Sequence, residues 1–462
     1  MSSIVSDPDH ARYGRHLTAG EINDLIKPTN KTSSLVKDWL HQNGVDLSKI
    51  RYSPAGDWMT VDLPVETANS LLGCKYSVFE NHDDATSLIR TPEWSLPRYL
   101  HDHVETIQPT NSFFHPIRKK QSQTMVKLRH NEMENVNHLS TEVAPSGTIA
   151  AACDQSMVSP ACLRTLYGTV NYTTRASGRN KMAMTNYLDE VSLRSDTKAY
   201  LDRFRPEISK SLDASELLFS QISINNGTTQ QTPLDPIQLA SQTGMEGNLD
   251  VQTLLGIAWP TPLTIYSTGG RQPNFTADYF TPTNTNEPYL DWVNFMLALK
   301  DSELPQVVST SYADTEQSVS KDYAIRVCNQ FAALGARGVS LLFGSGDEGV
   351  GGRQCLRNDG SNRSTFIPEF PPSCPYVTVV GGTQAFSPEV AAAHDGTGYV
   401  SGGGFGEYFS RPAIRMSQLS SICLQTTTFP PASKMACSAL LGAGILTSQL
   451  RVLTLESFGT VI

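Results

Sequence analysis

The sequence has no basic run longer than Arg118-Lys119-Lys120, and its 462 residues carry a formal net charge of −9. Because nucleic-acid binding requires a basic face or stripe, the sequence gives that class little support. No apolar run reaches the roughly 18 residues that a membrane-spanning helix needs; the nearest, 440–446, is short. We therefore predict a protein without a nucleic-acid or membrane partner.

Histidine is scarce in the second part of the chain. Nine of the ten histidines precede residue 139, and only His394 follows. The sequence contains no H-E-x-x-H, G-x-S-x-G or P-loop pattern, so the usual metalloprotease, α/β-hydrolase and nucleotide sites have no motif here. If the second part is hydrolytic, carboxylates must act as its bases, and such bases work best in acid.

Two carboxylates four residues apart stand at the start of a predicted helix, 244–255. Helical spacing places Glu246 and Asp250 on one face, close enough to share a proton and to raise the pKa of one of them. The alternative is a solvated first turn, where acids favour the helix dipole.

A third acid follows an apolar run a hundred residues later. Residues 339–343 predict a buried parallel strand that leads into the glycine-rich loop 344–352, which carries Asp347. The carboxyl ends of parallel strands are where α/β proteins place their binding sites. Asp347 is therefore a second candidate site residue.

Together, the E-x-x-x-D pattern and the S-G-D motif resemble the sedolisin family of serine-carboxyl peptidases, and in particular its fungal tripeptidyl-peptidases. The V-G-G-T motif at 380–383 and S-G-G-G-F-x-x-Y-F at 401–409 extend the resemblance. It implies that Glu246 is the general base, that Asp250 shares its proton, and that Asp347 serves the oxyanion hole. It also implies a substrate cleft in which an edge strand pairs with the peptide, lined by Ser309, Thr310, Ser311 and Tyr312.

Residues 1–118 form a first unit with two amphipathic helices, 18–26 and 32–43, two strands around the turn 54–57, and a third helix, 64–72. The motif S-D-P-x-H-x-x-Y-G-x-H-L-T at 6–18 and Y-S-P-A-G-D-W-M at 52–59 resemble the sedolisin propeptide, which acts as an intramolecular inhibitor. Residues 119–150 are a polar linker, and Arg118-Lys119-Lys120 is a candidate processing site.

Strands and helices alternate over residues 151–412. Predicted strands at 263–267, 307–312, 339–343 and 376–383 are separated by predicted helices at 288–300 and 318–334. The predicted fold class is α/β: an incomplete, subtilisin-like, doubly wound parallel-sheet catalytic domain, preceded by an α+β, ferredoxin-like propeptide domain.

The cysteines and sequons indicate an extracellular protein. We interpret Cys153 with Cys162, and Cys355 with Cys374, as two short-range disulfides, and Cys328 as a buried small apolar residue. Five N-x-S/T sequons are candidate glycosylation sites: Asn30, Asn171, Asn226, Asn274 and Asn362.

The resemblance stops near residue 412. The family continues to an S-G-T-S-x-S segment with the nucleophilic serine and to a C-terminal calcium site, and neither is found in 413–462, which we interpret as an aberrant tail. The start also lacks a secretory signal, so we expect a chain truncated at both ends. Without the serine, Glu246 has no proton to take.

The resemblance implies a secreted, monomeric, acid-acting zymogen of a tripeptidyl-peptidase or endopeptidase, with peptides or proteins as substrates and no metal site of its own in this chain. As given, the chain is predicted to be inactive. Two alternatives are a catalytically dead binding module that keeps its propeptide-bound cleft, and a fragment that does not fold.

Overall fold

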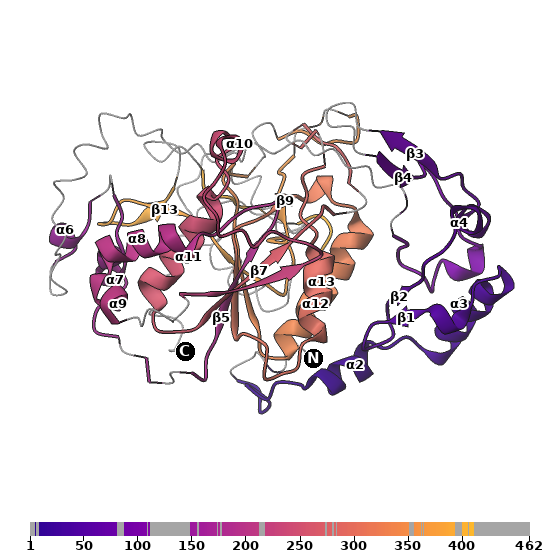
Figure 1. The fold of residues 1–462 in the computed structure, drawn as a ribbon, viewed down its shortest axis with the longest axis horizontal. Helices are drawn as coiled ribbons and strands as arrows, with labels where there is room; N and C mark the ends of the chain where they lie inside the picture. Colours follow the sequence, from indigo (N-terminus) through magenta and orange to yellow (C-terminus); the bar gives the residue numbers. More distant parts are fainter. Residues whose placement is uncertain are drawn as a thin grey trace, which may run out of the picture.

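The computed structural model describes residues 5, 9–80, 87–108, 110, 148–154, 157–172, 174–175, 178–211, 218–272, 275–279, 281–282, 284–350, 355–361, 363, 365–392, 400–404 and 406–410. In this part of the chain, a small α+β unit stands beside a larger α/β domain (Figure 1). None of its helices is long and apolar enough to cross a membrane. The tail 413–462, the processing site and His394 lie outside the described residues.

The α+β unit contains the predicted elements. Thr18 caps α2 (Ala19–Ile26) in a capping box with Glu21, as the sequence predicts. The other elements are α3 (Asn30–Gln42), η1 (Leu47–Lys49), β1 (Arg51–Tyr52), β2 (Met59–Thr60), α4 (Val65–Leu72), β3 (Ser77–Glu80), β4 (Ser87–Arg90) and η2 (Arg98–Leu100). The strands pair antiparallel as β1 with β2 and β3 with β4, and Trp39, Leu72 and Leu100 lie in the unit's core.

A six-stranded sheet forms the centre of the larger domain. Its order is β12 (Thr378–Val380), β10 (Ser340–Gly344), β8 (Val307–Thr310), β5 (Met182–Asn186), β7 (Leu263–Thr268) and β6 (Ser220–Ile224). Every pair in this sheet is parallel. The first strand, β5, is central and later strands are added on both sides of it, so the doubly wound topology is confirmed.

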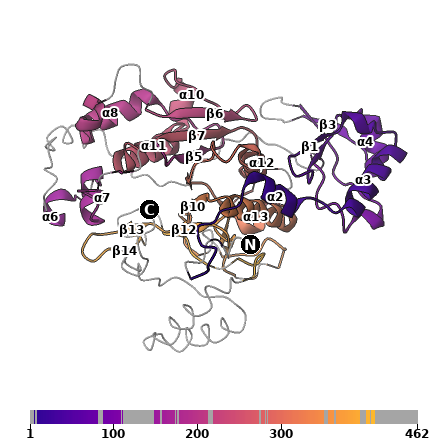
Figure 2. The same ribbon diagram turned by 90° about the horizontal axis from the view of Figure 1, so that it is seen from below.

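Helices cover both faces of this sheet (Figure 2). On one face lie α8 (Arg194–Phe204), α9 (Pro206–Ser211) and α11 (Met245–Ala258), and on the other lie α12 (Tyr289–Ala298) and α13 (Lys321–Ala336). Along β5, Met182 and Met184 face the first set of helices and Ala183 faces the second, because successive side chains of a strand point to opposite faces.

Shorter elements surround the sheet. They are α6 (Ile149–Ala152), α7 (Pro160–Leu166), α10 (Pro236–Ala240), η4 (Glu316–Ser318), and the antiparallel pairs β9 (Asp314–Thr315) with β11 (Glu369–Phe370) and β13 (Thr383–Gln384) with β14 (Val390–Ala391).

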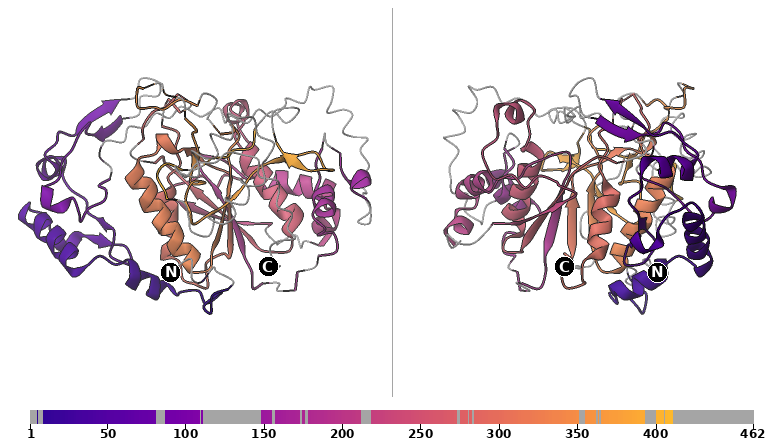
Figure 3. Two further views of the ribbon diagram at one scale, coloured as in Figure 1. Left: turned by 180° about the vertical axis from the view of Figure 1, so that it is seen from behind. Right: turned by 45° about the vertical axis from the view of Figure 1, so that its right-hand side comes forward.

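The first unit docks on the α12 and α13 layer at two places (Figure 3). At the first, Leu17 and Ile22 pack on Ala333 and Ala336, and the Leu17 N–H donates to the Ala336 carbonyl at 2.8 Å. At the second, the Arg326 side chain of α13 forms an ion pair with Asp57 and lies 3.6 Å from Glu105. We call these contacts the apolar clamp and the ionic clamp.

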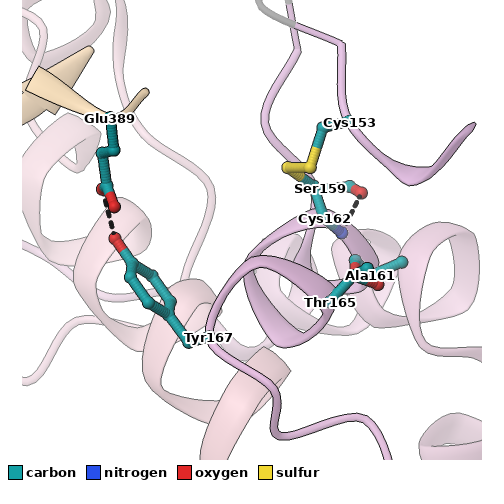
Figure 4. The surroundings of a disulfide bond; sticks show 7 residues. All are labelled: Cys153, Ser159, Ala161, Cys162, Thr165, Tyr167 and Glu389. Atoms are coloured by element: carbon teal, nitrogen blue, oxygen red, sulfur yellow. Dashed lines mark hydrogen bonds between the residues drawn. A yellow bond between two sulfur atoms is a disulfide. The ribbon is translucent and has the colours of Figure 1, made fainter. Parts of the chain in front are cut away.

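One predicted disulfide is confirmed and one is wrong. Cys153 pairs with Cys162, whose helix α7 begins at the Ser159 cap; nearby, the Tyr167 hydroxyl donates to Glu389 at 2.7 Å (Figure 4). Cys374 pairs with Cys328, and Cys355 is free. The error arose because α13 turns Cys328 into the core beside the chain that follows β11, although the two cysteines are 46 residues apart.

Candidate functional site

The amino-terminal turn of α11 lies at the carboxyl edge of the sheet, because α11 runs back from the end of β6 towards the start of β7. Glu246 lies in this turn and Asp250 follows one turn later. The Glu246 side chain is only 4% exposed. A solvated acid at a helix start would remain in water, so that alternative interpretation of Glu246 is wrong.

Asp250 is a half-buried acid that retains its proton. Burial raises its pKa to about 7, a hydrogen bond from Ser311 opposes the rise, and the charge of Glu190 adds to it. The Ser311 hydroxyl donates to Asp250 Oδ1 at 2.9 Å, whereas Oδ2 is buried without a hydrogen-bond partner among the described residues. This carboxyl therefore keeps its proton to a much higher pH than a free aspartate does.

Glu190 is a third acid of this cluster, and the sequence analysis missed it. It follows β5, it is 6% exposed, and its Oε1 accepts the Gly247 N–H at 3.2 Å. Burial raises its pKa, and the amides around the start of α11 oppose the rise. The sequence did contain a signal for this residue: Glu190 follows a buried strand, as Asp347 does. However, no motif includes Glu190.

Tyr312 lies near all three acids. Its pKa lies well above the ordinary value of a tyrosine, first because it is buried and then because Glu190, Glu246 and Asp250 surround it with negative charge. Tyr312 follows β8, next to β5 in the sheet. Three adjacent elements thus bring their ends together around one group of carboxyls.

The residues 309–312 are placed differently from the prediction. β8 lies between β5 and β10 and is hydrogen-bonded to both, so Ser309 and Thr310 cannot act as an edge strand, and that prediction is wrong. Thr310 is buried and accepts a hydrogen bond from Thr185 at 3.0 Å. The order of strands in a sheet cannot be predicted from the local sequence, because it depends on which distant segments pair. Ser311 and Tyr312 follow the strand and reach the acid cluster.

Asp347 follows β10, the strand on the other side of β8. It is half-buried, and burial followed by the charge of Glu348 raises its pKa. Its loop is joined to the second glycine-rich loop: the Val400 N–H donates to the Asp347 carbonyl at 2.9 Å, and the Gly402 N–H donates to Gly346 at 2.8 Å. A Cβ on Gly402 would stand 1.7 Å from the Ser345 carbonyl oxygen, so only glycine fits there.

The described residues include only some of the other predicted sites. The sequon residues Asn30, Asn171 and Asn226 are exposed, and Asn274 and Asn362 lie outside the described residues. Within the residues that the structure describes, no group of three or more His, Cys, Asp or Glu side chains could hold a metal ion. The region in which the family resemblance expects calcium, near the C-terminus, is not among them.

The fold and site define a class: a parallel α/β domain with an acidic cluster at the carboxyl edge of its sheet, preceded by a separate α+β unit. Residues 3–113 match the family model for the activation domain of pro-kumamolisin. The chain is a homologue of fungal tripeptidyl-peptidases, and the resemblance to the sedolisin family is confirmed.

Two relatives illustrate the match. The probable tripeptidyl-peptidase SED2 of Arthroderma benhamiae is 37% identical over 412 residues, which are 88% of this chain and 63% of the relative. The tripeptidyl-peptidase SED4 of Arthroderma otae is 35% identical over 416 residues, 88% of this chain and 62% of the relative. The chain thus spans less than two thirds of the length of these relatives.

Among solved structures, Pseudomonas sedolisin, a serine-carboxyl proteinase in complex with two molecules of pseudo-iodotyrostatin, matches with a TM-score of 0.38 and 20% identity. The match covers 57% of this chain and 66% of that protein.

Proposed function

We propose that the chain is the zymogen form of an acid-acting peptidase that hydrolyses peptides or proteins, as a tripeptidyl-peptidase or an endopeptidase. The observation that carries this proposal is the pair Glu246 and Asp250 at the carboxyl edge of the sheet, with the pKa of Asp250 raised to about 7. A carboxyl that keeps its proton up to neutral pH is suited to general acid and base work.

In the proposed mechanism, a serine hydroxyl attacks the peptide carbonyl and Glu246 takes its proton. Asp250 orients Glu246 and shares this proton, which passes to the leaving amine when the peptide bond breaks. Asp347, protonated in acid because its pKa is raised, donates a hydrogen bond to the oxyanion. Water then attacks the acyl-serine: Glu246 takes a proton from the water, and the serine oxygen leaves with a proton from Glu246, which frees the acid product.

We propose that residues 1–462 do not supply this serine themselves, because no S-G-T-S-x-S segment occurs among them. The first unit is proposed to inhibit the cleft within the same chain, and the protein is proposed to act outside the cell as a monomer. The Cys153–Cys162 and Cys328–Cys374 disulfides support an oxidising compartment.

A chimera tests the proposal. Residues 1–410 joined to the C-terminal part of the SED2 relative should release tripeptides or shorter products from fluorogenic peptides at acid pH. Glu246→Gln in that chimera should lower kcat by about 10²-fold or more, and Asp347→Asn by about 10²-fold. Asp196→Asn, a matched loss of one carboxylate on α8, should leave kcat unchanged. A folded chimera without activity would refute the peptidase proposal.

The missing S-G-T-S-x-S segment also favours a second candidate, a peptide-binding module that does not hydrolyse its ligand. Fluorescence anisotropy with labelled peptides tests it on residues 1–462. Saturable binding without cleavage supports this candidate, and the absence of binding at millimolar peptide excludes it.

A further inference from the structure

Glu190 is a buried carboxylate that the mechanism above does not use. It lies at the carboxyl end of β5, 57 residues before Gly247 in the chain, yet its Oε1 accepts the Gly247 N–H. Hydrogen bonds from the amides of Gly244 and Glu246 also act on it. All three amides belong to the start of α11.

The start of α11 needs such a partner. Its N-cap is Gly244, which is in the left-handed region at φ 88° and has no side chain to accept a hydrogen bond. The first amides of a helix have no partner within the helix and must find one elsewhere. A carboxylate is the preferred partner, because the helix dipole is positive at this end. Glu190 therefore caps α11 from another element.

The loop that carries Glu190 is strained. Leu188 and Asp189 both lie in the left-handed region, at φ 57° and 62°, where side chains other than glycine are rare. Two such residues in succession persist only where the surroundings hold them. The contacts of Glu190 with α11 provide this restraint, and Arg271 lies 4.0 Å from Asp189 in the same loop.

Two titratable groups of the candidate site interact with Glu190. They are Asp250 on α11 and Tyr312 after the end of β8, and Tyr312 also interacts with Glu246 and Asp250. Carboxylates in one buried cluster resist simultaneous ionisation, because each charge favours the protonated form of its neighbours. Burial also raises the pKa of Glu190. Its carboxyl therefore becomes charged at a higher pH than a free glutamate does.

We propose that Glu190 is a positioning residue for Glu246 and Asp250: it fixes the first turn of α11 against the end of β5, and its charge favours the protonated form of Asp250. This inference rests on the proposed function for its catalytic meaning. The two effects can be measured without any catalysis, because both are properties of the free protein.

The test is a titration of the full chain labelled with ¹³C at the aspartate carboxyls. The Asp250 signal is assigned by its loss in Asp250→Asn. Glu190→Gln keeps an oxygen for the Gly247 amide but removes the charge, so the midpoint of the Asp250 titration should fall by about one pH unit. Asp196 accepts a hydrogen bond from Asn248 of α11 and does not appear among the causes of the raised pKa of Asp250, so Asp196→Asn should leave the midpoint in place.

The positioning effect has its own measurement. Glu190→Ala should make the Gly247 amide exchange about tenfold faster, since a net hydrogen bond is lost, and Glu190→Gln should preserve its protection. If Glu190→Gln does not fold, Glu190→Asp, which keeps the charge on a shorter side chain, must retain the raised midpoint. An unchanged midpoint in Glu190→Gln, or an equal shift in Asp196→Asn, overturns the inference. The inactive chimera described above would refute the peptidase proposal and leave these titrations unaffected.

Discussion

Asp57→Asn is expected to loosen the first unit at the ionic clamp. The side chains of Arg326 and Asp57 are only 15% and 9% exposed, so water screens their attraction little. Removing one partner of a buried ion pair costs about 3–5 kcal/mol, because the other charge stays buried. Glu105, 3.6 Å from Arg326, takes over part of that charge, so we expect the lower end, about 3 kcal/mol.

Native-state hydrogen exchange of peptides from residues 9–80 measures this change. A loss of about 3 kcal/mol in the opening free energy makes these amides exchange roughly 100-fold faster or more, whereas the amides of the central sheet keep their rates. Glu105→Gln is the matched control on the same arginine. Glu105 is 62% exposed, so its loss should cost less than about 1 kcal/mol. Equal effects of the two variants, or no effect of Asp57→Asn, would refute the reasoning.

Three further outcomes are expected. Gly402→Ala should lower the free energy of unfolding by about 2 kcal/mol or more through displacement of the two joined loops, whereas Gly344→Ala, with open space at its Cβ, should change little in the same denaturant titration. Non-reducing peptide mapping should find Cys328 linked to Cys374, and Cys328→Ala should cost about 3–4 kcal/mol because a 46-residue loop is no longer closed; a Cys355 link would contradict the structure. Because the pKa of Asp250 is raised in the folded state, the folded protein binds more protons than the unfolded one between about pH 4 and 7. Its stability should therefore fall as pH rises through this window, by at most about 1.4 kcal/mol per pH unit from this group, and Asp250→Asn should flatten the dependence in urea titrations.

The local patterns of the sequence were sufficient for most elements of the fold. Thr18 and Glu21 mark the start of α2, and the alternation of apolar runs with helical stripes predicts the two layers of helices around a parallel sheet. These features depend on residues close together in the chain. The pair Glu246 and Asp250 could be found for the same reason, since both lie on one helix.

What the sequence could not provide are relations between distant residues. The position of β8 inside the sheet depends on which strands pair, and Cys328 meets Cys374 only after α13 has packed. Glu190 joins the site because a loop with two left-handed residues, Leu188 and Asp189, directs it towards α11. No spacing rule predicts a left-handed leucine.

The two clamps close very long loops of chain. The ionic clamp joins residues 269 positions apart. Beside the apolar clamp, the Ala19 N–H donates a hydrogen bond to Asp301 across 282 positions. The entropy of closing a loop grows only with the logarithm of its length, by about 0.6 kcal/mol for each doubling. Lengthening the linker 119–150 by tens of residues should therefore hardly weaken the docking. Cutting this linker also breaks none of the clamp contacts. The severed first unit therefore stays bound until the clamp contacts themselves break.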